Sequence, residues 1–168
     1  MGELVVTGAA GFIGSHVARF FGSRGLDVVR SDVPVPPKGE VSWKQAPLTQ
    51  MPELLELTHG VDAIVHIGGI GDVYQAAQDA RTAFRVNSRG TLNLLEAARR
   101  NGVRRFVYAS TWEVYGPAVY EPVDERHRCF PEHPYSLSKL VGDLQVQNFG
   151  RNSNLRTVVL RLGTTYGR

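Results

Sequence analysis

A glycine-rich turn near the start of the chain narrows what it can fold into more than any other feature. The apolar residues 4–6 run directly into the sequence TGAAGFIGSH. Glycines let the backbone turn tightly and approach a phosphate, and the start of the following helix offers N–H groups and a partial positive charge. We therefore predict that Gly8, Gly11 and Gly14 cradle a pyrophosphate. An ordinary tight turn is the alternative, because the spacing differs from the commoner Gly-x-Gly-x-x-Gly.

The residues after the turn favour a dinucleotide. Phe12 and Ile13 open a helical repeat of apolar residues, and a strand-like pattern at 26–29 then leads to Asp32. In dinucleotide-binding units a carboxylate at the end of the second strand holds the adenosine ribose hydroxyls. Asp32 would also repel a 2′-phosphate, which favours NAD over NADP, although Arg30 nearby could accommodate that phosphate. The alternative for Asp32 is a plain turn residue.

Strand-like and helix-like patterns alternate along the whole chain. Such alternation is typical of an α/β fold in which helices cover both faces of a doubly wound parallel sheet. We expect one domain over residues 1–168, a Rossmann fold of about six strands in the order 3-2-1-4-5-6, with ligands at the carboxyl ends of the strands. The predicted strands cover residues 4–6, 26–29, 41–45, 62–67, 106–109 and 157–160. The predicted helices follow the glycine turn and cover 51–58, 76–100 (with a break allowed in its first turns) and 135–149, and residues 116–134 form a surface loop.

The composition excludes several classes of protein. The net charge is only +3, and the basic cluster at 99–105 lacks interleaved aromatic residues, so no nucleic-acid partner is expected. No apolar run approaches the ~20 residues of a membrane-spanning helix, so no membrane association is expected. The single Cys129 cannot form an internal disulfide, which suits a reducing compartment and predicts a cytoplasmic protein. No metal site is predicted.

Two further patterns bring chemical groups to the expected ligand site. Tyr135 and Lys139 lie four residues apart in a predicted helix and so share a face. An ammonium near a phenol lowers the pKa of the phenol, which makes Tyr135 a candidate general acid or base. Ser110 and Thr111 follow the strand at 106–109 and place two hydroxyls at its carboxyl end. An ordinary amphipathic helix and strand-end capping are the respective alternatives.

Seven features in order resemble the extended short-chain dehydrogenase/reductase family, the nucleotide-sugar epimerases and dehydratases. They are TGAAGFIGSH, Asp32, VDAIVHIGG, VNSRGTLNLLEAA, FVYASTWEVYG, PYSLSK and RLGTTYG, and they span essentially the whole chain. The resemblance implies NAD as the cofactor, a sugar or nucleotide sugar as the substrate, and hydride transfer as the reaction. It also implies a homodimer formed through helices at 83–99 and 136–149.

The resemblance assigns roles to individual residues. Tyr135 is expected to act as the general acid or base, Thr111 to hold the reacting oxygen, and Lys139 to bind the cofactor ribose. Asn87 is expected to steady the active-site region. The implied cofactor contacts are Gly8, Gly11, Phe12, Ile13, Gly14, Asp32, Leu48, Gly68, Gly69, Asn87, Ser110, Tyr135 and Lys139.

Departures from the family pattern leave alternatives open. Pro47-Leu48 stands where family members carry Asp-Leu, so the carboxylate that reads adenine is missing, while Leu48 still offers its N–H. Gly68-Gly69 replaces the commoner Ala-Ala and resembles uronate dehydrogenases, as RLG at 161–163 does, whereas VYG at 114–116 resembles epimerases. Family members continue beyond this point into a small substrate domain, which we expect to be absent. A non-catalytic NAD-binding module is the alternative to an enzyme.

Overall fold

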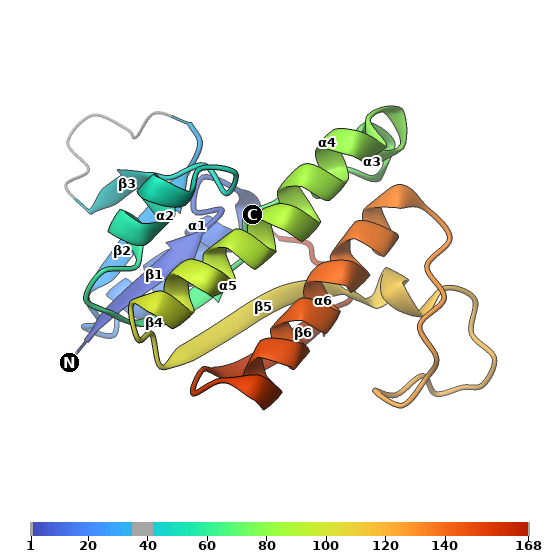
Figure 1. Cartoon of the computed structure of the whole chain (residues 1–168). Helices are drawn as coiled ribbons and strands as arrows, with labels where there is room; N and C mark the ends of the chain where they lie inside the picture. Colours follow the sequence, from blue (N-terminus) through green and yellow to red (C-terminus); the bar gives the residue numbers. More distant parts are fainter. Residues whose placement is uncertain (1, 35–41, 168) are drawn as a thin grey trace.

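A single sheet of six parallel strands forms the centre of the molecule (Figure 1). The computed structural model describes residues 2–34 and 42–167. The strands lie in the order β3-β2-β1-β4-β5-β6, which confirms the predicted parallel sheet and its order. Val41, the predicted start of the third strand, lies outside the described residues. The strands are β1 (Glu3–Thr7), β2 (Val28–Asp32), β3 (Trp43–Gln45), β4 (Val61–His66), β5 (Arg105–Thr111) and β6 (Arg156–Leu162).

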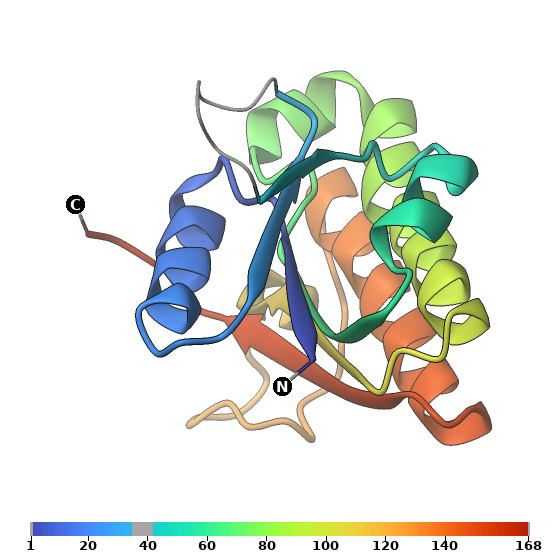
Figure 2. The same ribbon diagram turned by 90° about the vertical axis from the view of Figure 1, so that its left-hand side faces the viewer.

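Helices cover both faces of this sheet (Figure 2). One face carries α1 (Phe12–Gly22). The other face carries α2 (Met51–Leu57), α5 (Thr91–Arg100) and α6 (Pro134–Asn152). The sheet is therefore the middle of three layers, as the alternating pattern predicts.

The alternation of side chains along each strand gives each face its own apolar core. In β1, Leu4 and Val6 pack on the α1 side, while Val5 packs on the opposite side. Val5 and Val6 are both fully buried, as expected for a central strand covered on both faces. Ile64 of β4 and Phe106 of β5 extend the larger core under α2, α5 and α6. This packing holds the ends of the strands in a fixed arrangement.

The path of the chain reverses next to β1. From β1 it passes to β2 and β3 on one side, and it then crosses back to β4, β5 and β6 on the other. Because β1 pairs with both β2 and β4, the loops that leave the carboxyl ends of β1 and β4 diverge. In open parallel sheets such a switch point leaves a crevice in which ligands bind.

The helical region predicted over 76–100 is divided into four pieces. They are α3 (Val73–Gln78), α4 (Ala80–Ala83), the π-helix η1 (Phe84–Gly90) and α5. The break falls at Asp79, whose side chain accepts a hydrogen bond from the backbone N–H of Thr82 at 3.0 Å and whose own backbone is not helical. The π-helix was not predicted, and such segments are frequent at functional sites.

The chain between β5 and α6 is largely irregular, as its prolines predict. A 3₁₀ helix, η2 (Trp112–Tyr115), follows β5 directly, and residues 116–133 then contain no helix or strand. Pro134 occupies the first turn of α6, where its missing N–H has no cost. Within the described ranges, no helix combines the length and the apolar character needed to cross a membrane.

Candidate active site

The glycine turn is packed too tightly for side chains at two of its positions. Gly8 has a φ of 70°, and a Cβ there would lie 2.7 Å from the backbone nitrogen of Gly68. A Cβ on Gly14 would lie 2.0 Å from the carbonyl oxygen of Gly8. The turn therefore brings the start of α1 against the ends of β1 and β4. No side chain caps α1, whose N-cap is Gly11, so its first N–H groups suit an anion.

An open cleft of about 440 Å³ lies at the carboxyl ends of β1, β2, β4, β5 and β6, a size within the roughly 300 to 1,000 Å³ common for small-molecule sites. It gathers most of the predicted site residues: Gly8, Gly11, Phe12, Ile13, Gly14, Asp32, Gly68, Gly69, Ser110, Thr111, Tyr135 and Lys139. It is also lined by residues that were not predicted as site residues: Ile67, Ile70, Gly71, Ala109, Leu162, Gly163 and Thr165. These residues lie at or just after the carboxyl ends of β4, β5 and β6, so the expectation that ligands bind at the carboxyl ends of the strands was the signal that could have found them.

Asp32 holds its carboxylate beside the glycine turn. One oxygen accepts a hydrogen bond from the backbone N–H of Ala10 at 2.9 Å, and the other accepts from Val33 at 2.8 Å. Asp32 also lines the cleft, at the end of β2. A fixed carboxylate here can accept hydrogen bonds from a diol and repels a phosphate group. Together with the cramped glycine turn and the uncapped start of α1, it fits a dinucleotide.

Leu48 does not line the cleft. Its side chain is buried in the large core, and its carbonyl oxygen accepts a hydrogen bond from Asn93 at 3.0 Å. A Cβ on Gly90 would lie 2.7 Å from the Cβ of Leu48, so this side chain packs tightly against η1. The expected contact between the Leu48 N–H and adenine stays a prediction.

Asn87 is buried behind the cleft rather than in its lining. Its Oδ1 accepts from the backbone N–H of Ile70 at 2.8 Å, and its Nδ2 donates to the Ile70 carbonyl and to Ser138 Oγ, each at 3.0 Å. It therefore ties the loop after β4 to α6. The steadying role of Asn87 stays a prediction, and the cleft lining does not include Asn87, which was also expected to contact the cofactor.

Tyr135 and Lys139 share a face of α6, but the expected effect of Lys139 on the phenol is not found. Burial raises the pKa of Tyr135 above its usual value, and a hydrogen bond with Thr111 opposes the rise only in part. Lys139 Nζ lies 4.4 Å from the centre of the Tyr108 ring. Burial lowers the pKa of Lys139 to about 8 against the opposing pull of Asp143. The prediction that Lys139 lowers the phenol pKa is thus wrong for this structure, because burial raises that pKa and the charge of Lys139 is not among its causes.

An ion pair between Asp143 and Arg161 lies next to Lys139. Asp143, one turn further along α6, is fully buried and accepts from Arg161 Nε of β6 at 2.9 Å. Ser110 Oγ lies 3.3 Å from the same carboxylate. Asp143 forms an ion pair with Arg161, and its negative charge also acts on Lys139. The end of β6 is therefore held against α6, the helix that carries Tyr135. The only sign of this pair in the sequence is an acid in the interior of a predicted helix.

A chain of buried hydrogen bonds runs beneath the cleft and was not predicted. Thr7 Oγ1 accepts from two backbone N–H groups at the end of β4. Its own proton therefore goes to Nδ1 of His66, 2.7 Å away, and His66 Nε2 donates to Thr91 Oγ1 at 3.0 Å. Thr91 in turn donates to the carbonyl of Asn87 at 2.6 Å. These hydrogen bonds thus connect the end of β1 to Asn87 in η1.

His66 is neutral in this network. Complete burial, with a smaller contribution from the charge of Lys139, lowers the pKa of His66 to about 3. The geometry gives the same answer, because a protonated ring would present Nδ1–H to Thr7 Oγ1, which already accepts two hydrogen bonds. The sequence signal was a histidine inside the apolar strand VDAIVHI.

Among residues 2–34 and 42–167, no cluster of three or more His, Cys, Asp or Glu side chains could hold a metal ion. The groups that face the cleft are instead hydroxyls, a phenol, an ammonium and a carboxylate, contributed by Ser110, Thr111, Tyr135, Lys139 and Asp32. Such a set can bind a polyhydroxylated ligand and move a proton.

Comparison with known proteins identifies the family. The model of the NAD dependent epimerase/dehydratase family matches residues 4–168. UDP-glucose 4-epimerase from Azospirillum brasilense is 33% identical over 166 residues, which cover 95% of this chain and 48% of the relative. dTDP-glucose 4,6-dehydratase from Streptomyces niveus is 33% identical over 182 residues, which cover 98% of this chain and 54% of the relative.

Solved structures give the same result. A short-chain dehydrogenase/reductase superfamily protein from Agrobacterium tumefaciens with bound NAD superposes with a TM-score of 0.88 at 35% identity, covering 95% of this chain and 48% of that one. UDP-glucose 4-epimerase from Thermus thermophilus in complex with NAD superposes with a TM-score of 0.86 at 32% identity, covering 95% and 54%. The chain spans about half the length of these relatives. It belongs to the NAD-dependent epimerase/dehydratase family.

Proposed function

We propose that this chain is the cofactor-binding part of an NAD-dependent oxidoreductase that acts on a sugar or nucleotide sugar. The observation that carries the proposal is that one cleft joins the phosphate-sized turn at Gly8 and Gly14 to Thr111, Tyr135 and Lys139. Turn, carboxylate and acid–base groups come from separate parts of the sequence, and a simple phosphate-binding loop would not need them together. The solved relatives with bound NAD support the same cofactor here.

The residues of the cleft divide the chemical work. The N–H groups at the start of α1 hold the pyrophosphate, and Asp32 accepts hydrogen bonds from the adenosine ribose. The nicotinamide of bound NAD supplies the hydride acceptor. Lys139, with a pKa of about 8, is mostly protonated at neutral pH and can donate to the other ribose.

Tyr135 moves the proton. As a phenolate it removes a proton from the sugar hydroxyl whose carbon is oxidised, and as a phenol it returns that proton in the reverse step. Thr111 lines the same cleft as Tyr135 and can donate to the same sugar oxygen as it becomes a carbonyl. Since burial raises the pKa of Tyr135, the phenolate must be stabilised by positive charge when the site is at work.

Three reactions can follow this oxidation, and the experiment below distinguishes them. An epimerase returns hydride to the other face of the sugar, a dehydratase eliminates water, and a dehydrogenase releases the oxidised product. Gly68 and Gly69, the pair that resembles uronate dehydrogenases, both line the cleft. A Cβ on Gly69 would lie 2.7 Å from Asn87 Oδ1, so the glycine allows Asn87 its present position. A sugar-acid dehydrogenase is the second candidate, because this glycine pair and RLG at 161–163 resemble uronate dehydrogenases.

The test is to incubate the chain with NAD⁺ and a panel of nucleotide sugars and sugar acids. NADH absorbance detects a dehydrogenase, and chromatography of the sugars detects an epimerase or a dehydratase. Tyr135→Phe should lower the rate by at least about 100-fold while leaving NAD⁺ affinity nearly unchanged. Equal rates for wild type and variant would refute the role of Tyr135. NAD⁺ binding without any conversion would favour a non-catalytic module.

We also propose that α5 and α6 form a homodimer surface. Leu92 of α5 and Leu137 and Leu144 of α6 are 39%, 43% and 56% exposed, unusual for leucines on helices that otherwise pack on a sheet. α5 and α6 lie on the same face of the sheet (Figure 1). Analytical ultracentrifugation should show a dimer that Leu144→Glu dissociates, and a monomeric wild type would contradict the proposal.

A further inference from the structure

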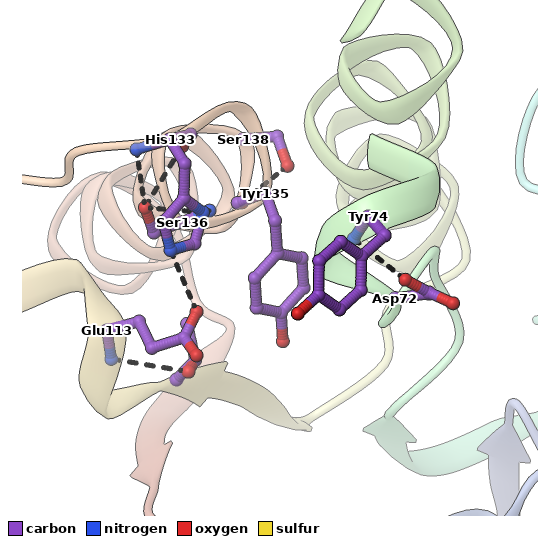
Figure 3. Close-up of polar contacts among 8 residues, drawn as sticks. Asp72, Tyr74, Glu113, His133, Tyr135, Ser136 and Ser138 are labelled. Atoms are coloured by element: carbon purple, nitrogen blue, oxygen red, sulfur yellow. Dashed lines mark hydrogen bonds and ion pairs between the residues drawn. The ribbon is translucent and has the colours of Figure 1, made fainter. Parts of the chain in front are cut away.

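His133 connects two elements of the active site through its two ring nitrogens (Figure 3). It is the N-cap of α6, where its Nδ1 accepts from the backbone N–H of Ser136 at 3.3 Å and Ser136 Oγ accepts from the His133 N–H at 3.4 Å. Histidine is an uncommon N-cap residue, since Ser, Thr, Asp and Asn are preferred. We therefore expect a second interaction of the His133 ring besides the cap.

The second ring nitrogen of His133 faces a carboxylate. His133 Nε2 lies 3.3 Å from Oε2 of Glu113, in η2. This carboxylate oxygen is buried and has no well-aligned hydrogen bond among the described residues, so the ring of His133 is its charge partner. Because Nδ1 accepts from Ser136, the neutral ring carries its proton on Nε2 and presents it to Glu113.

Both members of the pair touch the groups that do the chemistry. The backbone N–H of Glu113 donates to Thr111 Oγ1 at 3.3 Å. The ring of His133 stacks parallel to that of Tyr135, with centroids 6.1 Å apart and planes 8° apart. Figure 3 shows the pair beside the phenol, with His133 and Tyr135 at the start of α6 and Glu113 reaching His133 from η2. The negative charge of Glu113 is one of the causes that raise the pKa of Tyr135.

The pair is also open to solvent. The side chains of His133 and Glu113 are 33% and 29% exposed, and they line a hollow with the exposed Glu132. The titratable groups that face His133 are therefore Glu113 from η2, Glu132 from the preceding loop and Tyr135 from α6.

We propose that the Glu113–His133 pair is an electrostatic positioning element of the active site, in which His133 sets how much negative charge Glu113 presents to Tyr135. His133 is a positioning residue in this scheme, because it acts on the phenol through Glu113 while it caps the helix that carries Tyr135. The proposal rests on the proposed acid–base role of Tyr135. It adds a control of that role from outside the cofactor cleft.

The test reads the ionisation of Tyr135 without requiring turnover. The whole chain is labelled with 3-fluorotyrosine, which brings phenol titration into a more accessible pH range, and the signal of Tyr135 is assigned by its loss in Tyr135→Phe. Glu113→Gln should lower the midpoint of this titration by roughly half a unit or more, because it removes a negative charge and keeps the shape. Glu132→Gln, the matched control, should shift it by less than half as much.

The decisive comparison uses His133→Asn, which retains a side-chain cap for α6 but cannot reach Glu113 in the same way. On its own this change should raise the midpoint, since Glu113 loses its partner. In the Glu113→Gln background it should have no effect. A shift of equal size in both backgrounds, or no shift with Glu113→Gln, would overturn the proposal. If Tyr135→Phe turned over substrate at the wild-type rate, the proposed function would be overturned. The titration shifts of the Glu113 and His133 variants would still test the pair separately.

Discussion

Acidification should destabilise this protein through His66. The ring has a pKa of about 3 in the folded chain against 6.5 for a free histidine, so below pH 6.5 the unfolded state binds more protons than the folded state. The free energy of unfolding therefore falls as the pH drops from 6.5 towards 3. At pH 5 the loss due to His66 alone amounts to about 2 kcal/mol, a large share of the stability of a domain this size.

Urea unfolding followed by circular dichroism, at about pH 8 and about pH 5, measures this loss. His66→Gln keeps an acceptor for Thr7 and a donor for Thr91 but takes up no proton, so it should lose about 2 kcal/mol less than the wild type over this interval. His59→Gln, at an exposed position, is the matched control and should follow the wild type. Equal losses in wild type and His66→Gln would refute the neutral, buried network.

Two further changes test the framework of the cleft. Gly14→Ala places a Cβ 2.0 Å from the carbonyl oxygen of Gly8, so it should weaken NAD⁺ binding by at least about tenfold in calorimetry. The control is Gly22→Ala in the same helix, whose Cβ meets no atom within 4 Å and which should leave NAD⁺ binding unchanged. Asp143→Asn leaves Arg161 without its counter-charge and should lower the free energy of unfolding by about 2 kcal/mol or more in urea titrations. Loss of binding in Gly22→Ala, or unchanged stability in Asp143→Asn, would contradict these assignments.

The architecture could be predicted from the sequence because its signals are local. The apolar runs and the glycine turn each depend on residues close together in the chain, and chain connectivity rules then give the strand order. The same is true of Tyr135 and Lys139, which one helical turn brings together. The structure contains the predicted parallel sheet, and its cleft lies at the carboxyl ends of the strands, where ligands were expected.

What the sequence could not show depends on contacts between distant residues. His66 and Thr7 are far apart in sequence, and their hydrogen bond follows only from the register of β1 with β4. Asp143 and Arg161 meet in the same way, across α6 and β6. The pKa of Tyr135 was mispredicted because the sequence shows the charge of a neighbour but not the depth of burial.

The central claim is that the cleft between the glycine turn and Asp32 binds NAD. Calorimetric titration of the whole chain with NAD⁺ and with NADP⁺ tests it most directly. The account predicts NAD⁺ binding at least about tenfold tighter than NADP⁺, with the preference reduced in Asp32→Ser, which removes the charge that repels a 2′-phosphate. Absence of NAD⁺ binding, or tighter binding of NADP⁺ to the wild type, would contradict it.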